Sequence, residues 1–160
     1  MSAVNLLAAD HPLPLYDPEL RRIRTVKAES GEVTVETPGF SVQPHAYYRD
    51  AVEQLGLELK PCQYEVNLCP TEEEAALLRA YLKQNCVPGE TVELWYLWVG
   101  TESGKPRRFS GPLEDLDRAA LEQLEDRPLG QTCLSIRISR ADASHDQRRN
   151  QHGEQSHWTY

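Results

Sequence analysis

The sequence predicts a single α/β or α+β domain with a mixed sheet of five to six strands and three helices. From Cys62 to Ser139, apolar runs alternate with helix-like segments in the order strand, helix, strand, helix, strand, which is the order of β-α-β crossover units. Before them, two segments of alternating polarity flank a turn, which is typical of an antiparallel hairpin. The expected sheet is therefore mixed, with an N-terminal antiparallel hairpin and a C-terminal β-α-β-α-β half.

The N-terminal part of the chain predicts strands. Residues 4–9 form an apolar run that stops at the Asp-His-Pro sequence of residues 10–12, which fits a buried strand followed by an irregular loop. Residues 22–28 and 33–36 alternate polar and apolar side chains around the turn residues 29–32. We expect a hairpin with one face in solvent.

Two helices are predicted in the middle of the chain. Tyr48, Val52 and Leu55 lie at helical spacing and indicate a short helix. Thr71 precedes three glutamates and a longer apolar stripe, so its side chain can accept from a first-turn amide while Glu74 reaches back. The pattern predicts a well-capped second helix.

The C-terminal half predicts two more strands and a third helix. Residues 92–99 carry apolar side chains on both faces, which indicates an interior strand. Residues 100–111 read as a long polar loop, and Pro112 is placed to begin a helix. Residues 132–139 alternate in polarity, so we expect a half-exposed strand near a sheet edge. The crossover connections predict that the strands between 62 and 139 are parallel.

Length and composition indicate how the chain is organised. We expect residues 1–140 to form one domain and residues 141–160 to form a polar tail that is flexible or docked by Trp158 and Tyr160. The opening residues 4–18 resemble the start of small bacterial proteins in which a strand runs into a Leu-Pro-Leu loop, and this resemblance implies no activity.

The charge balance excludes some function classes. A formal net charge of −8 argues against general binding to nucleic acids or membrane surfaces. No secretory signal and no long apolar run is present, so a cytoplasmic location is expected. The histidines and the cysteines show no metal-ligand spacing, so neither a metal nor a cofactor is predicted; the cysteines are Cys62, Cys69, Cys86 and Cys133.

One hypothesis places a catalytic site at the carboxyl ends of the expected parallel strands. Cys69 directly precedes a helix N-terminus, whose partial positive charge favours a thiolate. His11, with Asp10 beside it, is a candidate base from a distant part of the chain. This pattern is typical of a small cysteine-dependent hydrolase or transferase.

A second hypothesis is an anion or nucleotide site in the loop of residues 100–111. Lys105, Arg107 and Arg108 lie just before the helix expected at Pro112, whose first amides can receive an anion. The loop departs from a phosphate-binding motif, because three residues rather than four separate its glycines and a proline follows the lysine.

The leading hypothesis is a non-catalytic interaction or regulatory protein of bacterial type, with a protein partner or self-association. The chain carries no complete catalytic or cofactor motif, and its acidic composition suits a soluble binding protein. Whether it is also an enzyme is left open by the sequence.

Overall fold

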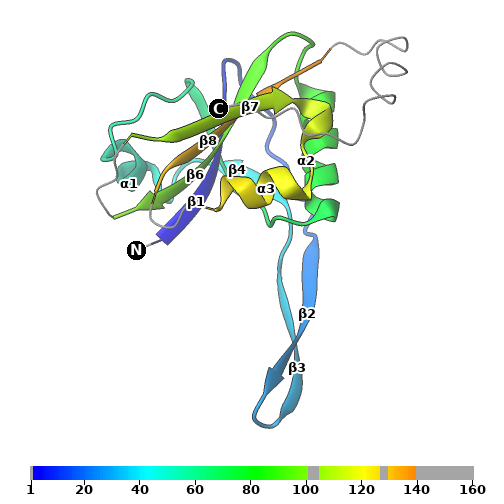
Figure 1. Ribbon diagram of the computed structural model, residues 1–160. Coiled ribbons are helices and arrows are strands. Elements are labelled where there is room, and N and C mark those ends of the chain that lie inside the picture. The colour runs from blue at the N-terminus through cyan, green and yellow to red at the C-terminus, as the bar shows by residue number, and fades with distance from the viewer. Residues whose placement is uncertain (1, 101–104, 127–129, 140–160) are drawn as a thin grey trace.

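A six-stranded mixed sheet lies at the centre of the molecule, accompanied by a two-stranded hairpin and three α-helices among the described residues. The structure is a computed structural model that describes residues 2–100, 105–126 and 130–139. In Figure 1 the hairpin extends away from the sheet and its helices. The predicted fold class is confirmed. The expected tail at residues 141–160 lies outside the described residues.

The strands of the six-stranded sheet follow the order β4-β5-β1-β6-β8-β7, and β2 pairs with β3 in the hairpin. The elements along the chain are β1 (Ser2–Ala9), β2 (Arg21–Ala28), β3 (Gly31–Pro38), β4 (Ser41–Pro44), α1 (Arg49–Glu53), β5 (Cys62–Asn67), α2 (Glu72–Asn85), β6 (Thr91–Val99), β7 (Arg107–Pro112), the 3₁₀ turn η1 (Leu113–Asp115), α3 (Arg118–Leu124) and β8 (Thr132–Arg137).

Strand directions differ from the expected parallel arrangement. β1 lies between β5 and β6 and is antiparallel to both. β6 and β8 are also antiparallel, and among the described strands only β7 and β8 pair in parallel. The prediction of parallel strands between residues 62 and 139 is therefore wrong for β8, although β5 and β6, each antiparallel to β1, run in the same direction. The expected loop 100–111 contains β7, which reverses the chain between β6 and β8, and β1 inserts between β5 and β6 so that these two strands are not neighbours.

The interior position predicted for residues 92–99 is confirmed, because β6 lies between β1 and β8. The half-exposed character predicted for residues 132–139 is wrong, and β8 lies one strand in from the sheet edge. β8 lies between β6 and β7, and it buries Cys133 and Leu134 completely. β7 occupies the edge instead.

The two faces of the sheet carry separate apolar cores. Successive side chains along β1 and β6 point to opposite faces of the sheet. Complete burial of one leucine side chain contributes about 1.5–3 kcal/mol to the free energy of unfolding. Helices α2 and α3 cover one face, and α1 with the segment after it covers the other. The first core includes Leu7, Leu94, Leu78 and Leu121, and the second includes Leu6, Leu97, Trp95 and Val52.

Helix α2 begins at the cap that the sequence predicts. The Thr71 hydroxyl accepts a hydrogen bond from the Glu74 amide at 3.2 Å. The Glu74 carboxylate does not complete the expected reciprocal box on the Thr71 amide, because it accepts from the Cys69 amide at 2.9 Å and binds Arg22.

The third helix begins later than Pro112 predicts. Pro112 ends β7, a 3₁₀ turn follows, and α3 is capped by Asp117, whose carboxylate accepts from the Ala120 amide at 2.9 Å. In the described part of the chain, no helix has the length and apolar character needed to cross a membrane.

Candidate functional site

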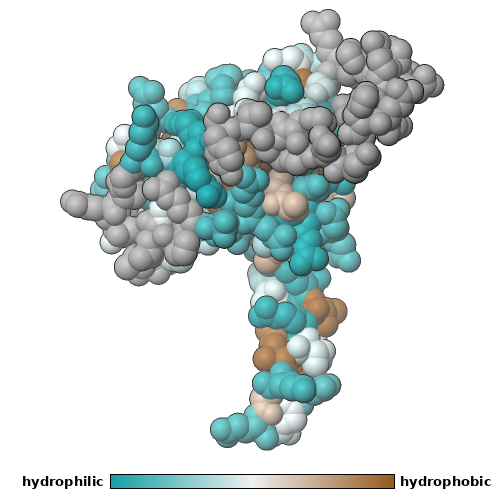
Figure 2. Space-filling view, in the orientation of Figure 1, coloured by the Kyte–Doolittle hydropathy of each residue, from teal (hydrophilic) through white to brown (hydrophobic). Residues whose placement is uncertain are grey.

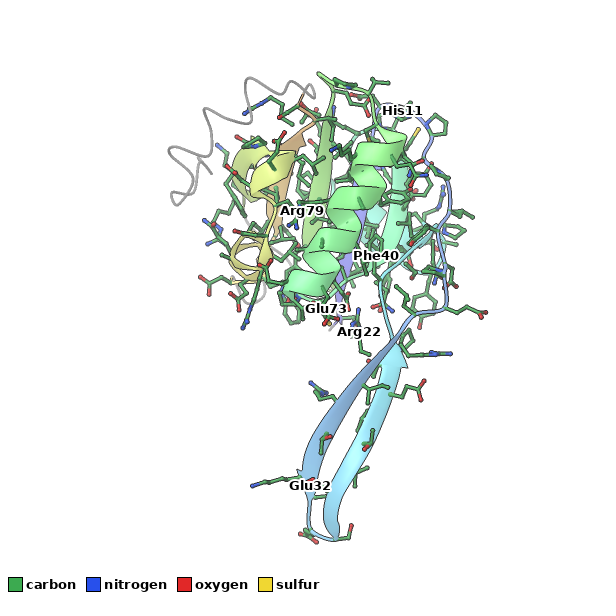
Figure 3. All side chains as sticks on the ribbon, turned by 90° about the vertical axis from the view of Figure 1, so that its right-hand side faces the viewer. His11, Arg22, Glu32, Phe40, Glu73 and Arg79 are labelled. Atoms are coloured by element: carbon green, nitrogen blue, oxygen red, sulfur yellow. The ribbon has the colours of Figure 1, made fainter. Side chains whose placement is uncertain are left out.

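The residues predicted for catalysis lie at opposite ends of the sheet. β1 and β5 are antiparallel with Ala9 opposite Cys62, so His11 follows the end of β1 where β5 begins, whereas Cys69 follows the end of β5. The strand between Cys62 and Asn67 alone spans roughly 17 Å. In Figure 3 His11 lies at the far end of α2 from the helix start marked by Glu73. The fold does not bring the candidate nucleophile and base together.

The environment of Cys69 opposes the expected thiolate. Burial raises the pKa of its thiol, the nearby Arg22 guanidinium lowers it, and the Glu74 carboxylate raises it again. The net shift of this pKa is upward, chiefly because burial disfavours the charged thiolate. Glu74 adds negative charge at the helix N-terminus that was expected to favour a thiolate.

His11 and Asp10 have separate partners. The His11 ring makes hydrogen bonds from Nδ1 to the Pro12 carbonyl at 2.9 Å and from Nε2 to Glu90 Oε1 at 2.8 Å. The bond to Glu90 is the main cause that raises the pKa of His11, followed by the bond to Pro12. Asp10 accepts from Lys60 Nζ at 2.7 Å. Asp10 therefore does not hold the ring of His11.

The predicted anion-binding arginines are directed to different internal partners. Arg107 donates to the Gln123 carbonyl at 2.6 Å. Arg108 lies over the Trp95 ring at 4.9 Å, with its guanidinium 3.9 Å from Glu93. Lys105 is exposed just before β7, and residues 101–104 of the predicted loop lie outside the described residues. The two guanidinium groups do not converge on one site.

A polar cavity of about 410 Å³ lies between the start of β1 and strands β4 and β5. Its lining includes Asn5, Gln43, Glu65 and Asn67. The Asn5 side-chain oxygen is buried there without a hydrogen-bond partner among the described residues. The Asn67 side-chain oxygen accepts from Arg22 at 3.0 Å, so this cavity adjoins the base of the hairpin.

The hairpin formed by β2 and β3, residues 21–38, is called the arm from here on. The arm exposes apolar side chains on both faces, so the expectation of a single solvent face is wrong. Val26 and Val33 pair across the strands and are 40% and 45% exposed, and Ile23, which points to the opposite face, is 72% exposed. Figure 2 shows hydrophobic side chains along the arm. An isolated two-stranded hairpin is at best marginally stable in water, so a surface of this kind favours contact with another molecule.

Both long edges of the arm are available for strand pairing. Among the described strands, β2 and β3 pair only with each other. Each therefore presents an outer row of backbone N–H and C=O groups, which is a template for an added strand. The two edges differ in charge, because β2 carries Arg24 and Lys27 whereas β3 carries Glu32 and Glu36.

A buried ion pair fixes the base of the arm. Arg22, the second residue of β2, binds both carboxylate oxygens of Glu74 through Nε and a terminal nitrogen, the latter at 2.8 Å. Its side chain also donates to Asn67 at 3.0 Å. The Glu74 side chain is 7% exposed and also accepts from the Cys69 amide. Figure 3 shows Arg22 where the arm meets the start of α2. The arm is therefore tied to the helix and to β5.

The fold and this site define a mixed α/β protein with an anchored, projecting hairpin arm. A scan of protein-family models and searches of curated proteins and solved structures found no match to the chain.

The site residues that the sequence reasoning missed, Arg22 and Glu74, are separated by 52 positions and show no local spacing signal. The exposed arm had one signal, because six of the fifteen residues from 22 to 36 are charged.

Proposed function

We propose that this chain is a non-catalytic protein-interaction protein and that the arm is its contact element. The observation that carries the proposal is the arm itself, a hairpin with exposed apolar side chains and two unpaired edges. Exposed strand edges are normally protected in proteins that act alone. The natural partner is an extended protein segment that adds a strand to one edge.

The charges of the arm give the added strand a preferred edge. A partner strand rich in acidic side chains pairs beside Arg24 and Lys27 on β2, and a basic strand pairs beside Glu32 and Glu36 on β3. Complementary charges contribute specificity and association rate more than affinity. The anchor at Arg22 supports such binding, because a preorganised element loses less entropy on association.

The two other hypotheses have less support from the described contacts. The cysteine mechanism needs Cys69 within hydrogen-bond reach of His11, directly or through one water, and the antiparallel register separates them. The anion site needs Arg107 and Arg108 to converge, and each has an internal partner.

The test compares the wild type with two double variants of the arm. Val26→Lys with Val33→Glu removes the apolar pair but keeps an attractive cross-strand pair. The matched control, Thr25→Lys with Thr34→Glu, places the same charges on the neighbouring pair of the opposite face. Hydrogen exchange of the arm amides checks that each hairpin remains paired.

Partner binding is measured by sedimentation for self-association and by quantitative recovery of proteins on immobilised bait. We expect the Val26/Val33 variant to weaken the interaction at least about tenfold, equivalent to roughly 1.4 kcal/mol. The Thr25/Thr34 variant should weaken it less. A wild type that is monomeric at all concentrations and recovers the same proteins as the Val26/Val33 variant would refute the proposal.

A further inference from the structure

Three ligand-type side chains from distant parts of the sequence converge at the C-terminal end of α2. His11 follows β1, Cys86 caps α2, and Glu90 directly precedes β6. One imidazole nitrogen, the Cys86 sulfur and a Glu90 carboxylate oxygen all lie within 4.8 Å of one another. We propose that these three residues bind a divalent transition-metal ion of the zinc class, which prefers a mixed nitrogen, sulfur and oxygen ligand set.

The His11 ring is oriented as a metal ligand. Its Nδ1 is 2.9 Å from the Pro12 carbonyl oxygen, so this nitrogen donates its proton there and Nε2 is directed toward Glu90 at 2.8 Å. Metal-ligating histidines almost always use the second ring nitrogen for a hydrogen bond of this kind, which fixes the ring and its tautomer.

Backbone hydrogen bonds hold the other two ligands in place. The Cys86 amide donates to the Leu82 carbonyl at 2.9 Å. The Glu90 carbonyl accepts from the Ile138 amide at 2.9 Å, and the Gly89 amide donates to the Ile138 carbonyl at 2.7 Å. Gly89 has a φ of +96°, which a glycine adopts without strain, and this turn returns the chain toward the end of α2.

The cluster is closed on one side and open on the other. Cys86 is buried, the Glu90 side chain is 16% exposed and the His11 side chain is 38% exposed. Three protein ligands with one accessible position is the pattern of a four-coordinate zinc site completed by water. The charges also balance, because a thiolate and a carboxylate neutralise a dication while histidine stays neutral.

The His11 and Glu90 ligand atoms need only a small adjustment to accept the ion. Tetrahedral bonds of about 2.0–2.1 Å place a nitrogen and an oxygen ligand roughly 3.3 Å apart. Nε2 of His11 and Oε1 of Glu90 are 2.8 Å apart, so they separate by about 0.5 Å on binding. Both side chains are partly exposed to solvent. The ion replaces the hydrogen bonds that the Cys86 thiol and the His11 ring make with Glu90.

The test titrates the full chain, after removal of metals by a chelator, with Co²⁺ as a spectroscopic probe for zinc. We expect one equivalent to produce a thiolate-to-cobalt charge-transfer band and visible bands of four-coordinate cobalt, and zinc should displace it. Cys86→Ser should abolish the charge-transfer band. His11→Asn, a change at a partly exposed loop residue, should weaken binding at least about 100-fold, because even an outer-shell partner is worth 10–100-fold.

Two controls separate this site from other metal-binding groups. Cys62→Ser removes a half-buried thiol outside the cluster, and a variant in which His145, His152 and His157 are changed to Asn removes the histidines of residues 141–160. Both should keep the wild-type spectrum and affinity. Absence of the charge-transfer band in the wild type would overturn the proposal. Three other results would also overturn it: survival of the charge-transfer band in Cys86→Ser, wild-type cobalt affinity in His11→Asn, or loss of the band in either control variant. This site and the arm are tested independently.

Discussion

Replacing Glu74 by glutamine removes the charge that anchors the arm. One carboxylate oxygen accepts from the Cys69 amide at 2.9 Å and from Arg22 at 2.8 Å, and the other accepts from Arg22 Nε. Each hydrogen bond to a charged group contributes about 1.5–3 kcal/mol. Glutamine keeps one acceptor but turns an amide nitrogen toward the guanidinium. Because the Arg22 side chain is 23% exposed and water recovers part of its solvation, we expect a loss of about 2–4 kcal/mol in the free energy of unfolding.

The assay is urea denaturation followed by far-ultraviolet circular dichroism, with thermal unfolding as a second measurement. For a domain of this size about 1 kcal/mol lowers Tm by 2–4 °C, so the Glu74→Gln variant should lose roughly 4–16 °C. Glu73→Gln is the matched control, because Glu73 lies in the same helical turn but is exposed. It should cost less than about 1 kcal/mol.

A double variant separates the ion pair from simple loss of packing. Arg22→Met combined with Glu74→Leu replaces both charges by apolar side chains of similar volume, which is often neutral or stabilising for a buried pair. This variant should recover most of the stability that Glu74→Gln loses. If Glu74→Gln costs no more than Glu73→Gln, the ion pair does not anchor the arm and the reasoning fails.

Three further predictions concern other contacts. Gly39→Ala places a Cβ 2.9 Å from the Leu20 Cβ, so we expect a loss of about 1–3 kcal/mol in urea denaturation; unchanged stability would contradict the close approach. In wild-type protein the pKa of His11 lies above its ordinary value of 6.5 because of Glu90, and Glu90→Gln should lower it in an NMR titration. The stabilisation from this pair is complete below the ordinary value and lost as pH rises through the raised pKa; an unchanged pKa in the variant would exclude Glu90 as the cause. Burial and Glu90 raise the pKa of Cys86 to about 12, so a thiol reagent at mildly alkaline pH should modify Cys86 only when the protein unfolds, as mapped by mass spectrometry; rapid labelling of the native protein would refute this.

Local patterns predicted the elements that depend on neighbouring residues. The two apolar faces of residues 92–99 indicated an interior strand because both faces of β6 are covered, by one core on each side. The cap at Thr71 was readable because its partner amide is three residues away. Elements with such local causes could be predicted from the sequence.

Strand order could not be predicted, and the site hypothesis that depended on it was misplaced. β7 has the sequence Arg-Arg-Phe-Ser-Gly-Pro, whose charged and turn-forming residues read as a loop. It forms a strand because it pairs with β8 and buries Phe109. The candidate pair Cys69 and His11 required the first strand to run in the same direction as β5, and the register shows the reverse. The pairs Arg22 with Glu74 and His11 with Glu90 are separated by 52 and 79 positions, which no spacing rule detects.

The central place of β1 has a consequence for the order in which the molecule can form. Its neighbours β5 and β6 are synthesised much later, so the completely buried Leu6 and Leu7 lack their sheet partners until the ribosome has released residues up to Val99. Pairings between distant segments form slowly, and unpaired apolar strands are prone to aggregation while they wait. During translation β1 therefore stays unpaired until its partners emerge, whereas the arm, whose two strands are close in sequence, does not depend on later residues for its pairing.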